Sequence, residues 1–559
     1  MVDSYSRSSC LVIIAAMITG RTIIARSRSS WSGINARRRI AIAIILLITS
    51  ISVLGLFRHS HRWRLWNSGE VPIAFWAWHP DCPAEDDVRR AVNEARAQTL
   101  FLRTGQIDLE GGKLWRIRAV TGRFPNNIDI HFVFNATRSC LAEFERVSST
   151  DLAAVICRAY EEDRARAARD HARVVGLQLD FDVPTRLLPT YTKLLKETRV
   201  LLPSTSKLSI TGLPTWMESS ALSDTLDAVD FWIPQCYGAR VPETLSQSQS
   251  QSISSLKDVA ASIAKARLLN RPYSAGLAAY GYAIQYARDG SLIALRGDLD
   301  PTMVVNDSNL ELMSRGPFEQ EREPADATRW RCLYRARKDE VIAGAALHAM
   351  DYLMLDVPTS GSLREATKIA REQGGDHLLG ICVFRLPRQD DPTTLTIKEV
   401  GAALSGETPS SSFQAEANVE RDLVPDLGVV STRVRLRIVN DGSASSMLDD
   451  GAMQLLLAVP DQKVRRLTIS GFDSASSQRQ RPDLLDQSIE PILRPCSLAR
   501  ANVLALTAKV WRPEKEATVT LEFAGDPPQA LRATMTLTLD DGRVLHEGKT
   551  IKLEAIRQR

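Results

Sequence analysis

Two aspartates at the end of an apolar run are the side chains best suited to chemistry in this sequence. Asp180 and Asp182 follow the run Val174–Leu179 and precede Pro184. A short apolar run that ends at a proline predicts a buried strand. Because side chains alternate along a strand, Gln178, Asp180 and Asp182 are expected to share one face. Two carboxylates on one face repel each other, so the pKa of one should rise, as general acid catalysis requires.

A structural role for the second aspartate is the alternative. Asp182 stands before Pro184 and could open the helix that is predicted around Tyr191–Val200. The row of three polar side chains favours a site over a simple helix cap. The position of this row also favours a functional site, because α/β barrels carry their catalytic residues at the C-terminal ends of the strands.

Strands alternate with helices from Val71 onward, which predicts parallel pairing and an α/β fold. Helical patterns cover Glu85–Ala97, Leu152–Val174, Tyr191–Leu201 and Leu363–Glu372. The strand candidates are Ile73–Trp78, Thr99–Arg103, Ile128–Phe134, Val175–Asp182, Leu208–Leu213, Val229–Cys236, Tyr273–Ala279 and Leu379–Leu386. Eight such units predict a (β/α)8 TIM-type barrel over residues 71–400.

Two stretches interrupt the barrel pattern. The long gap Gly281–Gln373 is predicted to hold an inserted helical element that includes Trp330–Leu355. The polar, low-complexity segment Leu245–Ser255 is predicted to be a mobile loop at the C-terminal face, as a plain insertion or a substrate lid.

After a Ser-rich linker at Ser405–Ser412, short strands with period-two alternation replace the helices. They predict an all-β accessory domain over residues 413–559, of the β-sandwich type. The strand candidates are Val430–Val439, Arg465–Ile469, Leu504–Trp511, Thr518–Phe523, Thr534–Leu539 and Val544–Leu553.

The first 64 residues predict a membrane anchor. Ile40–Phe57 is uncharged and follows Arg37, Arg38 and Arg39. Its eighteen residues span about 27 Å as a helix, enough for a thin bilayer. Basic residues on the N-terminal side predict a cytoplasmic N-terminus, a single-pass inner-membrane protein and a periplasmic body. A cleaved signal peptide and a buried core helix are the alternatives.

Composition limits the function classes. The chain is 44% hydrophobic and 24% charged, which is ordinary for globular proteins. Its net charge of +4 lies largely in the N-terminal segment, so nothing indicates a nucleic-acid partner. The eight cysteines include no Cys-x-x-Cys pair, and no histidines stand at metal-ligand spacing. We therefore predict no metal site and no cofactor.

Five segments together resemble a bacterial family of unknown function, domain-of-unknown-function family 3142, over about residues 71–400. They are Phe75–His79, Phe101–Gly105, Leu177–Asp182, Ile210–Trp216 and Ile381–Pro387. The fourth predicted strand is also distantly similar to the signature of family 18 glycoside hydrolases, the chitinase type. Gln178 replaces one of the strand acids of that signature, and Asp182 replaces its proton-donating Glu. Val229–Tyr237 resembles that family's sixth strand, and Gly238 replaces the Asp that follows its Tyr.

The resemblance implies roles for these residues. Asp182 would be the general acid, Asp180 its electrostatic partner, and Tyr237 a hydrogen-bond donor to the reacting group. Trp76 or Trp78 would stack on a sugar ring or belong to the core, and Glu218 would be a second carboxylate or a surface residue. Arg385 is expected to pair with one of the two aspartates and lower its pKa. The predicted substrate-binding residues are Gln178, Trp76, Trp78, Trp216, Glu218, Gln235, Tyr280 and Arg385.

Two functions follow from this pattern. The first is a membrane-anchored, periplasm-facing glycoside-hydrolase-like protein that acts on an unidentified glycan. The second is a catalytically inactive barrel that binds a glycan or a partner protein, which the replacements at Gln178 and Asp182 favour. A metal-dependent hydrolase is disfavoured because the sequence offers no histidine cluster.

Overall fold

A computed structural model describes residues 71–238, 241–318, 329–389, 391–424, 429–460, 463–480, 493–539 and 542–553. The predicted anchor Ile40–Phe57, with the rest of residues 1–64, lies outside these described residues. Among the helices that are described, none combines the length and the apolar character needed to cross a membrane.

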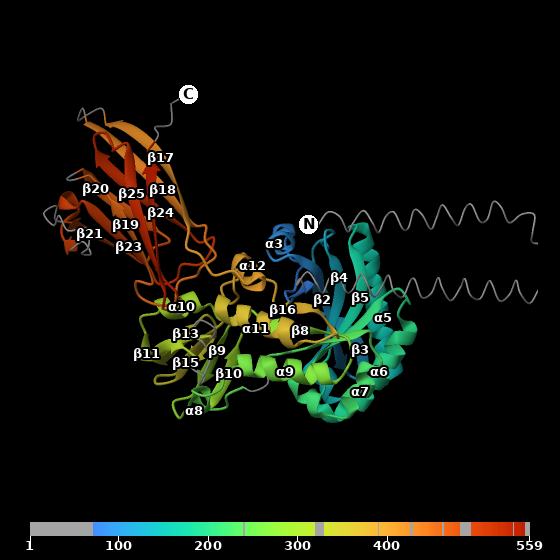
Figure 1. Cartoon of the computed structure of the whole chain (residues 1–559). Helices are drawn as coiled ribbons and strands as arrows, with labels where there is room; N and C mark the ends of the chain where they lie inside the picture. Colours follow the sequence, from blue (N-terminus) through green and yellow to red (C-terminus); the bar gives the residue numbers. More distant parts are fainter. Residues whose placement is uncertain are drawn as a thin grey trace, which may run out of the picture. The chain divides into compact units, whose positions relative to one another are not determined.

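Eight parallel strands close into the predicted barrel (Figure 1). The order is β1-β16-β8-β7-β6-β5-β4-β2, and β2 pairs with β1 to close the ring. The fourth predicted strand ends at Asp180, so Asp182 lies beyond the ladder and strand alternation no longer fixes its direction. The barrel strands are β1 Ile73–Ala77, β2 Ala97–Glu110, β4 Asp129–Ala136, β5 Arg173–Asp180, β6 Lys207–Gly212, β7 Phe231–Pro234, β8 Tyr273–Ala278 and β16 Leu378–Phe384.

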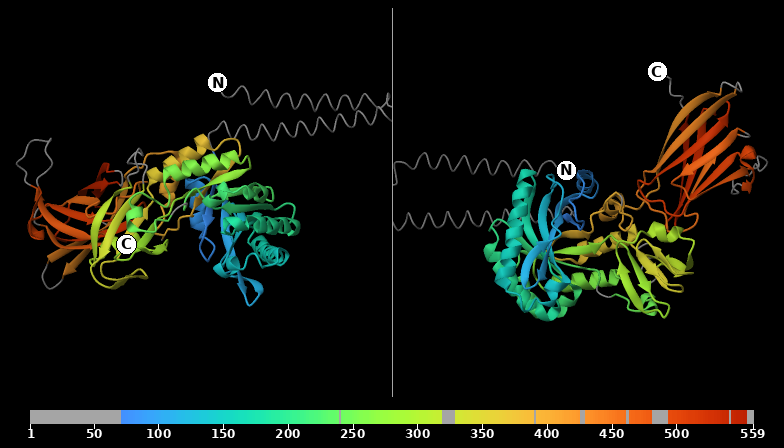
Figure 2. Two further views of the ribbon diagram at one scale, coloured as in Figure 1. Left: turned by 90° about the horizontal axis from the view of Figure 1, so that it is seen from below. Right: turned by 180° about the vertical axis from the view of Figure 1, so that it is seen from behind.

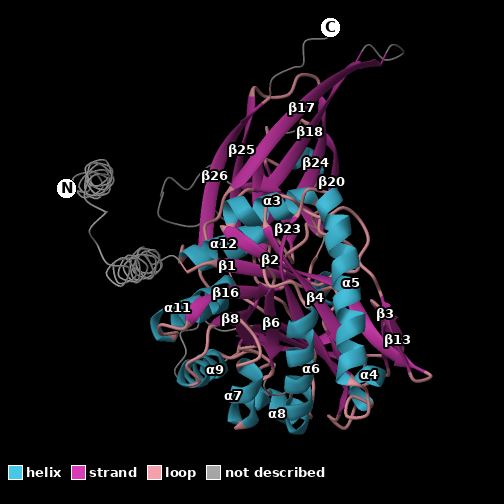
Figure 3. Cartoon of the chain, turned by 90° about the vertical axis from the view of Figure 1, so that its right-hand side faces the viewer, coloured by secondary structure: helices cyan, strands magenta, loops and turns pink. Residues whose placement is uncertain are grey.

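Helices flank the barrel strands (Figure 3). In the longest of them, α5, Ser148 caps the first turn by accepting a hydrogen bond from the backbone N–H of Asp151. Leu152, Ile156 and Tyr160 follow one another at helical spacing and are buried. The helices are α3 Glu85–Glu94, α4 Arg138–Ala142, α5 Ser149–Arg169, α6 Leu188–Leu201, α7 Ala221–Leu226, α9 Leu256–Leu268, α11 Ser360–Gln373 and α12 Ile397–Ser405.

The second barrel strand continues well past its predicted end at Arg103. The extension of β2 folds back as the antiparallel strand β3, Lys113–Ile117. Gly111 and Gly112 form the turn with φ of 57° and 77°, which suits a two-residue hairpin. The β2–β3 hairpin therefore extends the barrel wall at the C-terminal end of β2.

The insertion between β8 and β16 is a five-stranded antiparallel sheet, so the prediction of a helical element was wrong. Trp330, Cys332 and Tyr334 are buried and alternate with the more accessible Arg331, Leu333 and Arg335, which is the period of a strand. The sheet order is β10 Leu292–Arg296, β9 Tyr282–Tyr286, β15 Tyr352–Val357, β12 Trp330–Ala336 and β11 Leu310–Pro317. A hairpin of β13 Glu340–Ile342 and β14 Ala345–Leu347 and the short helix α10 Pro301–Asn306 complete it.

The polar segment Leu245–Ser255 is packed, contrary to the prediction of a mobile loop. It begins with the short helix α8, Leu245–Ser248, and Ser248, Ser252 and Ser255 are all buried. Ile253 lies in a cluster with Ile284, Tyr286 and Met354 of the inserted sheet. Small hydroxyl side chains satisfy buried polar groups here, a role that the composition alone did not indicate.

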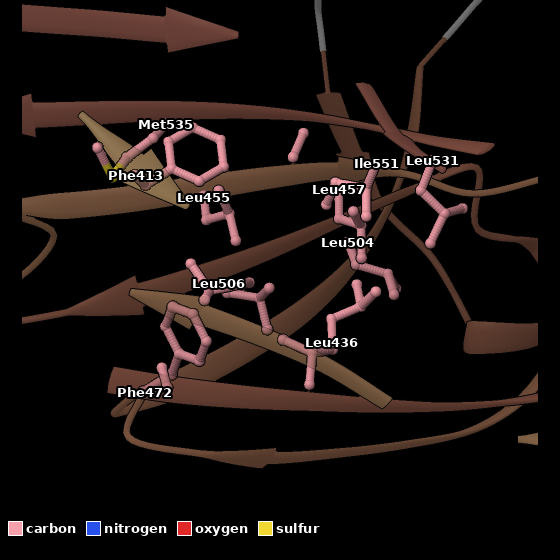
Figure 4. Close-up of a cluster of buried hydrophobic side chains, with 14 of the residues drawn as sticks. Phe413, Leu436, Leu455, Leu457, Phe472, Leu504, Leu506, Leu531, Met535 and Ile551 are labelled. Atoms are coloured by element: carbon pink, nitrogen blue, oxygen red, sulfur yellow. The ribbon is translucent and has the colours of Figure 1, made fainter. Parts of the chain in front are cut away.

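Two antiparallel sheets in the C-terminal region share one hydrophobic core, as in a β-sandwich (orange to red in Figure 2). Leu436 of one sheet and Leu455, Leu504 and Met535 of the other contribute to it (Figure 4). One sheet has the order β17 Phe413–Val424, β18 Val429–Asn440, β24 Glu516–Ala524 and β20 Val464–Ser470. The other is β22 Leu493–Pro495, β21 Ser474–Gln480, β23 Val503–Ala508, β19 Met453–Ala458, β25 Ala530–Thr538 and β26 Val544–Lys552.

Candidate active site

The two aspartates lie where β5 reaches the mouth of the barrel. Asp180 is the last residue of β5 and is only partly accessible, whereas Asp182 is exposed. The hydroxyl of Thr211 on β6 donates a hydrogen bond of 2.5 Å to Asp180 Oδ1. On the other side, Asp180 stands in register with Asn135 of β4. Thr211 thus holds Asp180, whereas Asp182 is accessible to a ligand.

Burial raises the pKa of Asp180 to about 7, and the charge of Asp182 adds to the shift, while the Thr211 hydrogen bond and the charge of Arg103 oppose it. Loss of hydration also raises the pKa of Asp182. Because Asp182 is exposed, water weakens this second effect. The two carboxyls interact, so they titrate as a pair that retains a proton close to neutral pH. Such a pair can donate a proton to a bound substrate.

Gln178 lies behind the aspartates and binds Trp76, not Asp180. Its Oε1 accepts a 2.7 Å hydrogen bond from Trp76 Nε1, and its Nε2 donates to Ser209 Oγ at 3.4 Å. The amide is therefore engaged within the barrel, and Thr211 is the residue that holds Asp180. Trp76 is only 2% exposed, so its ring fills the barrel interior and is not free to stack on a sugar.

Aromatic rings surround the mouth. Tyr237, Tyr280 and Trp78 all contact Phe384, with ring centroids 6.1, 5.0 and 5.9 Å from it. Burial is the main reason that the pKa of Tyr237 is raised, and the charges of Asp180 and Asp182 add to it. Tyr237 follows β7, so it lies at the same end of the barrel strands as the two carboxyls.

Three predicted site residues lie apart from the carboxyls or act on them indirectly. Trp216 is fully buried and donates from Nε1 to the carbonyl of Val183 at 2.9 Å, so it supports the segment that carries Asp182. Glu218 is exposed and pairs with Lys265 of α9 at 2.9 Å. Gln235 is half-buried, and its backbone N–H donates to the carbonyl of Gly212 at 2.9 Å.

The prediction that Arg385 pairs with one of the two aspartates was wrong. Its guanidinium donates to Asp391 Oδ2 at 2.8 and 3.0 Å and to Thr393 Oγ1 at 2.8 Å. Asp391 lies in the loop after β16, a few residues along the chain, and this local partner satisfies the arginine. Arg385 therefore does not lower the pKa of either site carboxyl through an ion pair.

Sequence reasoning missed three polar residues of the mouth. Thr211 holds Asp180, and Arg103 of β2 donates from Nε to Asn135 Oδ1 at 3.2 Å. Thr211, Arg103 and Asn135 each occupy a position on a barrel strand where side-chain alternation points inward. This alternation is the signal that could have identified them. No group of three His, Cys, Asp or Glu side chains in the described ranges is arranged to hold a metal ion.

Comparisons with known proteins match the middle of the barrel to one family. Residues 145–314 match the family model described as "Domain of unknown function (DUF3142)". No curated protein matches the sequence.

Among solved structures, the spore cortex-lytic enzyme SleL of Bacillus cereus is 15% identical and covers 60% of this chain and 74% of its own, with a TM-score of 0.38. A chitinase from Chromobacterium violaceum is 12% identical and covers 60% of this chain and 98% of its own, with a TM-score of 0.39. A chitinase-like agglutinin from Robinia pseudoacacia is 13% identical and covers 59% of this chain and 99% of its own, with a TM-score of 0.37. The family resemblance predicted from the strand motifs is thus confirmed over residues 145–314, the segment that carries both aspartates and Tyr237, and that segment matches family DUF3142.

Proposed function

We propose that the barrel mouth is the site of a glycoside-hydrolase-like protein that acts on a glycan. The observation that carries the proposal is the pair formed by Asp180 and Asp182. These carboxyls stand at the C-terminal end of a barrel strand and have raised pKa values, and Tyr237 and a group of aromatic rings lie at the same end of the barrel. Catalytic carboxyl pairs and sugar-binding aromatic surfaces are the features that glycoside hydrolysis needs.

In this mechanism, Asp182 gives its proton to the glycosidic oxygen while the bond from that oxygen to the anomeric carbon breaks. Water then adds its hydroxyl to the anomeric carbon and returns a proton to the carboxyl pair. Asp180, held by Thr211, keeps the proton available by sharing the charge of the pair. The hydroxyl of Tyr237 donates a hydrogen bond to the oxygen on which charge develops.

Turnover of a panel of polysaccharides by the full-length protein tests this function. Asp182→Asn removes the proton donor and is expected to slow turnover about 10²–10⁴-fold, the usual contribution of a general acid. Glu218→Gln is the matched control, because Glu218 is exposed and pairs with Lys265 away from the mouth. Equal turnover by wild type and Asp182→Asn would overturn the proposal.

An inactive barrel that binds a glycan or a partner protein is the second candidate. It is favoured by Asp182, which is exposed and carries a shorter side chain than the Glu expected from the hydrolase signature. A displacement near 1 Å can reduce a rate about 10²-fold. In this case glycan binding survives Asp180→Asn combined with Asp182→Asn, and no polysaccharide is cleaved by the wild type.

We also propose where the protein lies in the cell. Ile40–Phe57 anchors it in the inner membrane by a single pass, and residues 71–400 and 413–559 form a barrel domain and an all-β accessory domain on the periplasmic side. The basic residues before the apolar run support this orientation.

A further inference from the structure

Among the described residues, neither Arg103 on the wall of the barrel mouth nor the nearby Arg118 pairs with a carboxylate. Arg103 donates from Nε to Asn135 Oδ1, and its guanidinium carbon lies 5.4 Å from the centre of the Trp78 ring. Arg118 follows β3. Burial is the main cause that lowers the pKa of Arg103, and the charge of the nearby Arg118 lowers it further, whereas the charge of Asp180 raises it. Within the described ranges, neither guanidinium forms an ion pair. A half-buried cation without a counter-charge favours binding of an anion.

The neighbouring arginines make a clear contrast. Arg116 on the same hairpin pairs with Asp163 of α5 at 2.5 Å, and Arg385 on the opposite side of β1 pairs with Asp391 at 2.8 Å. Their charges are neutralised by ion pairs, whereas Arg103 and Arg118 form no ion pair among the described residues. The terminal nitrogens of Arg103 thus remain able to donate to a ligand.

The β2–β3 hairpin places an exposed aromatic ring on the same wall. Gln106 of β2 is in register with both Asn135 of β4 and Ile117 of β3, and Asn135 is in register with Asp180. The hairpin therefore extends the series of paired strands that leads across the barrel wall to Asp180.

The direction of the aromatic side chain follows from its neighbour. Arg116 points outward to α5, so the adjacent Trp115 points to the opposite, mouth-facing side of the hairpin. Trp115 is 48% exposed, which is unusual for a residue of its size. Three strand spacings separate β3 from β5, about 14 Å along the wall. Only an extended chain can reach both Trp115 and the aspartates.

We propose that the glycan recognised at this mouth is an acidic polysaccharide, whose carboxylate binds Arg103 and Arg118 while a sugar ring farther along the chain stacks on Trp115. The inference rests on the proposed function, because it names the substrate class of the same site. A guanidinium matches a carboxylate through two parallel N–H bonds, and an aromatic face binds the apolar side of a sugar ring.

Binding of the full-length protein to polygalacturonate, hyaluronan and alginate tests the inference, each compared with the same polymer after reduction of its carboxyls to alcohols. At least one charged polymer is expected to bind about 10-fold more tightly than its reduced form, equivalent to about 1.4 kcal/mol. Arg103→Gln and Arg118→Gln are each expected to remove most of this preference. Trp115→Ala is expected to weaken binding of the polymer and leave binding of galacturonic acid unchanged.

Arg158→Gln is the matched control, because Arg158 is exposed on α5 and its loss changes the net charge equally. Arg118 is exposed, so its variant should fold even if Arg103→Gln does not; thermal unfolding of each variant checks this. Equal binding of charged and reduced polymers, or equal effects of Arg118→Gln and Arg158→Gln, would overturn the inference. Dextran sulfate bound as tightly as the best uronate polymer would overturn it as well, because that result indicates general polyanion attraction.

Turnover measured in the same samples separates this inference from the proposed function. Preference for a charged polymer without cleavage would leave the inference standing and refute hydrolysis. Cleavage of neutral glycans without any preference for a charged polymer would support hydrolysis and refute the inference.

Discussion

Asp180 is expected to make the folded protein less stable as the pH rises from about 4 to about 7. Burial raises its pKa from an ordinary 3.8 to about 7, so the folded state binds a proton more strongly than the unfolded state over this interval. Stability falls with pH wherever the folded state holds more protons. Asp180→Asn removes the buried charge, and Thr211 can still donate to the amide oxygen. We expect this variant to unfold at a higher temperature than wild type at pH 8 and at a similar temperature at pH 4.

Asp182→Asn is the control for that measurement, because Asp182 is exposed and its charge is stabilised by water. Its effect on unfolding temperature at pH 8 should be smaller. A gain for Asp180→Asn that is the same at both pH values would contradict the assignment.

The hydrogen bond between Trp76 and Gln178 should contribute measurably to stability. Gln178→Leu leaves the indole N–H of Trp76 without a partner inside the barrel, where an unsatisfied donor costs about 1–3 kcal/mol. Urea unfolding of the variant measures the loss. In a double-mutant cycle with Trp76→Phe, the two losses should be less than additive. Additive losses would mean that the two side chains do not interact.

At the scale of single residues, the sequence predicted where the chemistry lies better than which groups meet there. Asp180 and Asp182 were found because they interrupt an apolar run. Gln178 meets Trp76 across 102 residues, a contact that no local pattern contains. The partner of Arg385 was missed for the opposite reason: Asp391 is a near neighbour in a loop, and strand parity says nothing about loops.

At the scale of elements, a buried ion network joins the inserted sheet to the barrel. Asp356 of β15 is fully buried and pairs with Arg329 and Arg331. Burial acts to raise the pKa of Asp356, but the charges of the two arginines more than offset it, so the pKa lies below the usual value. Arg331 also donates to the carbonyl of Gln251 at 2.7 Å, and Arg329 to that of Tyr280 at 2.9 Å. The network thus links the polar loop after β7 with the aromatic rings of the mouth.

Asp356→Asn is expected to destabilise the protein by about 3–5 kcal/mol, because two buried guanidinium groups lose their counter-charge. The loop around Gln251 should open first, since it depends on Arg331. Thermal unfolding measures the first effect, and limited proteolysis followed by mass spectrometry locates the second. Glu311→Gln, which breaks an accessible pair with Arg335 on the same sheet, should change stability by less than about 1 kcal/mol. Equal losses in the two variants would contradict the role of the network.

The inserted sheet also shows where element prediction fails. A long gap between barrel strands was expected to be helical, yet Trp330–Ala336 alternates buried and accessible side chains. The barrel strands themselves were predicted because each belongs to a local strand–helix unit. The insertion is antiparallel, and its strands pair across loops of very different length, so no repeating unit marks them.

At the scale of the molecule, the C-terminal sheets and the barrel are joined by hydrogen bonds that the sequence did not indicate. Arg512 donates to the carbonyls of Asp391 and Thr394, and Lys398 of α12 donates to Asp441. Asp391 is also the partner of Arg385 at the edge of the mouth. The loop after β16 therefore connects the C-terminal region with the candidate site. This connection depends on long-range contacts, whereas the barrel topology follows from local patterns.

The N-terminal segment is expected to hold the molecule in a membrane. The apolar run Ile40–Phe57 and the arginines before it predict that the full chain sediments with membranes and resists extraction at high pH. Deleting residues 1–64 should release the rest of the chain into the soluble fraction. Replacing both Ile45 and Leu47 by Arg should also prevent insertion, because each charge at the centre of a span costs about 2.5–3.5 kcal/mol.

The control exchanges Ile45 and Leu47 for Leu and Ile, which preserves the apolar character of the run and should preserve the membrane association. Alkaline phosphatase fused after residue 70 reports the side of the membrane, since that enzyme is active only where disulfides form. Activity of the fusion is expected, because the basic side of the run holds the N-terminus in the cytoplasm. A soluble full-length chain would contradict the anchor, and an inactive fusion in the membrane fraction would contradict only the orientation.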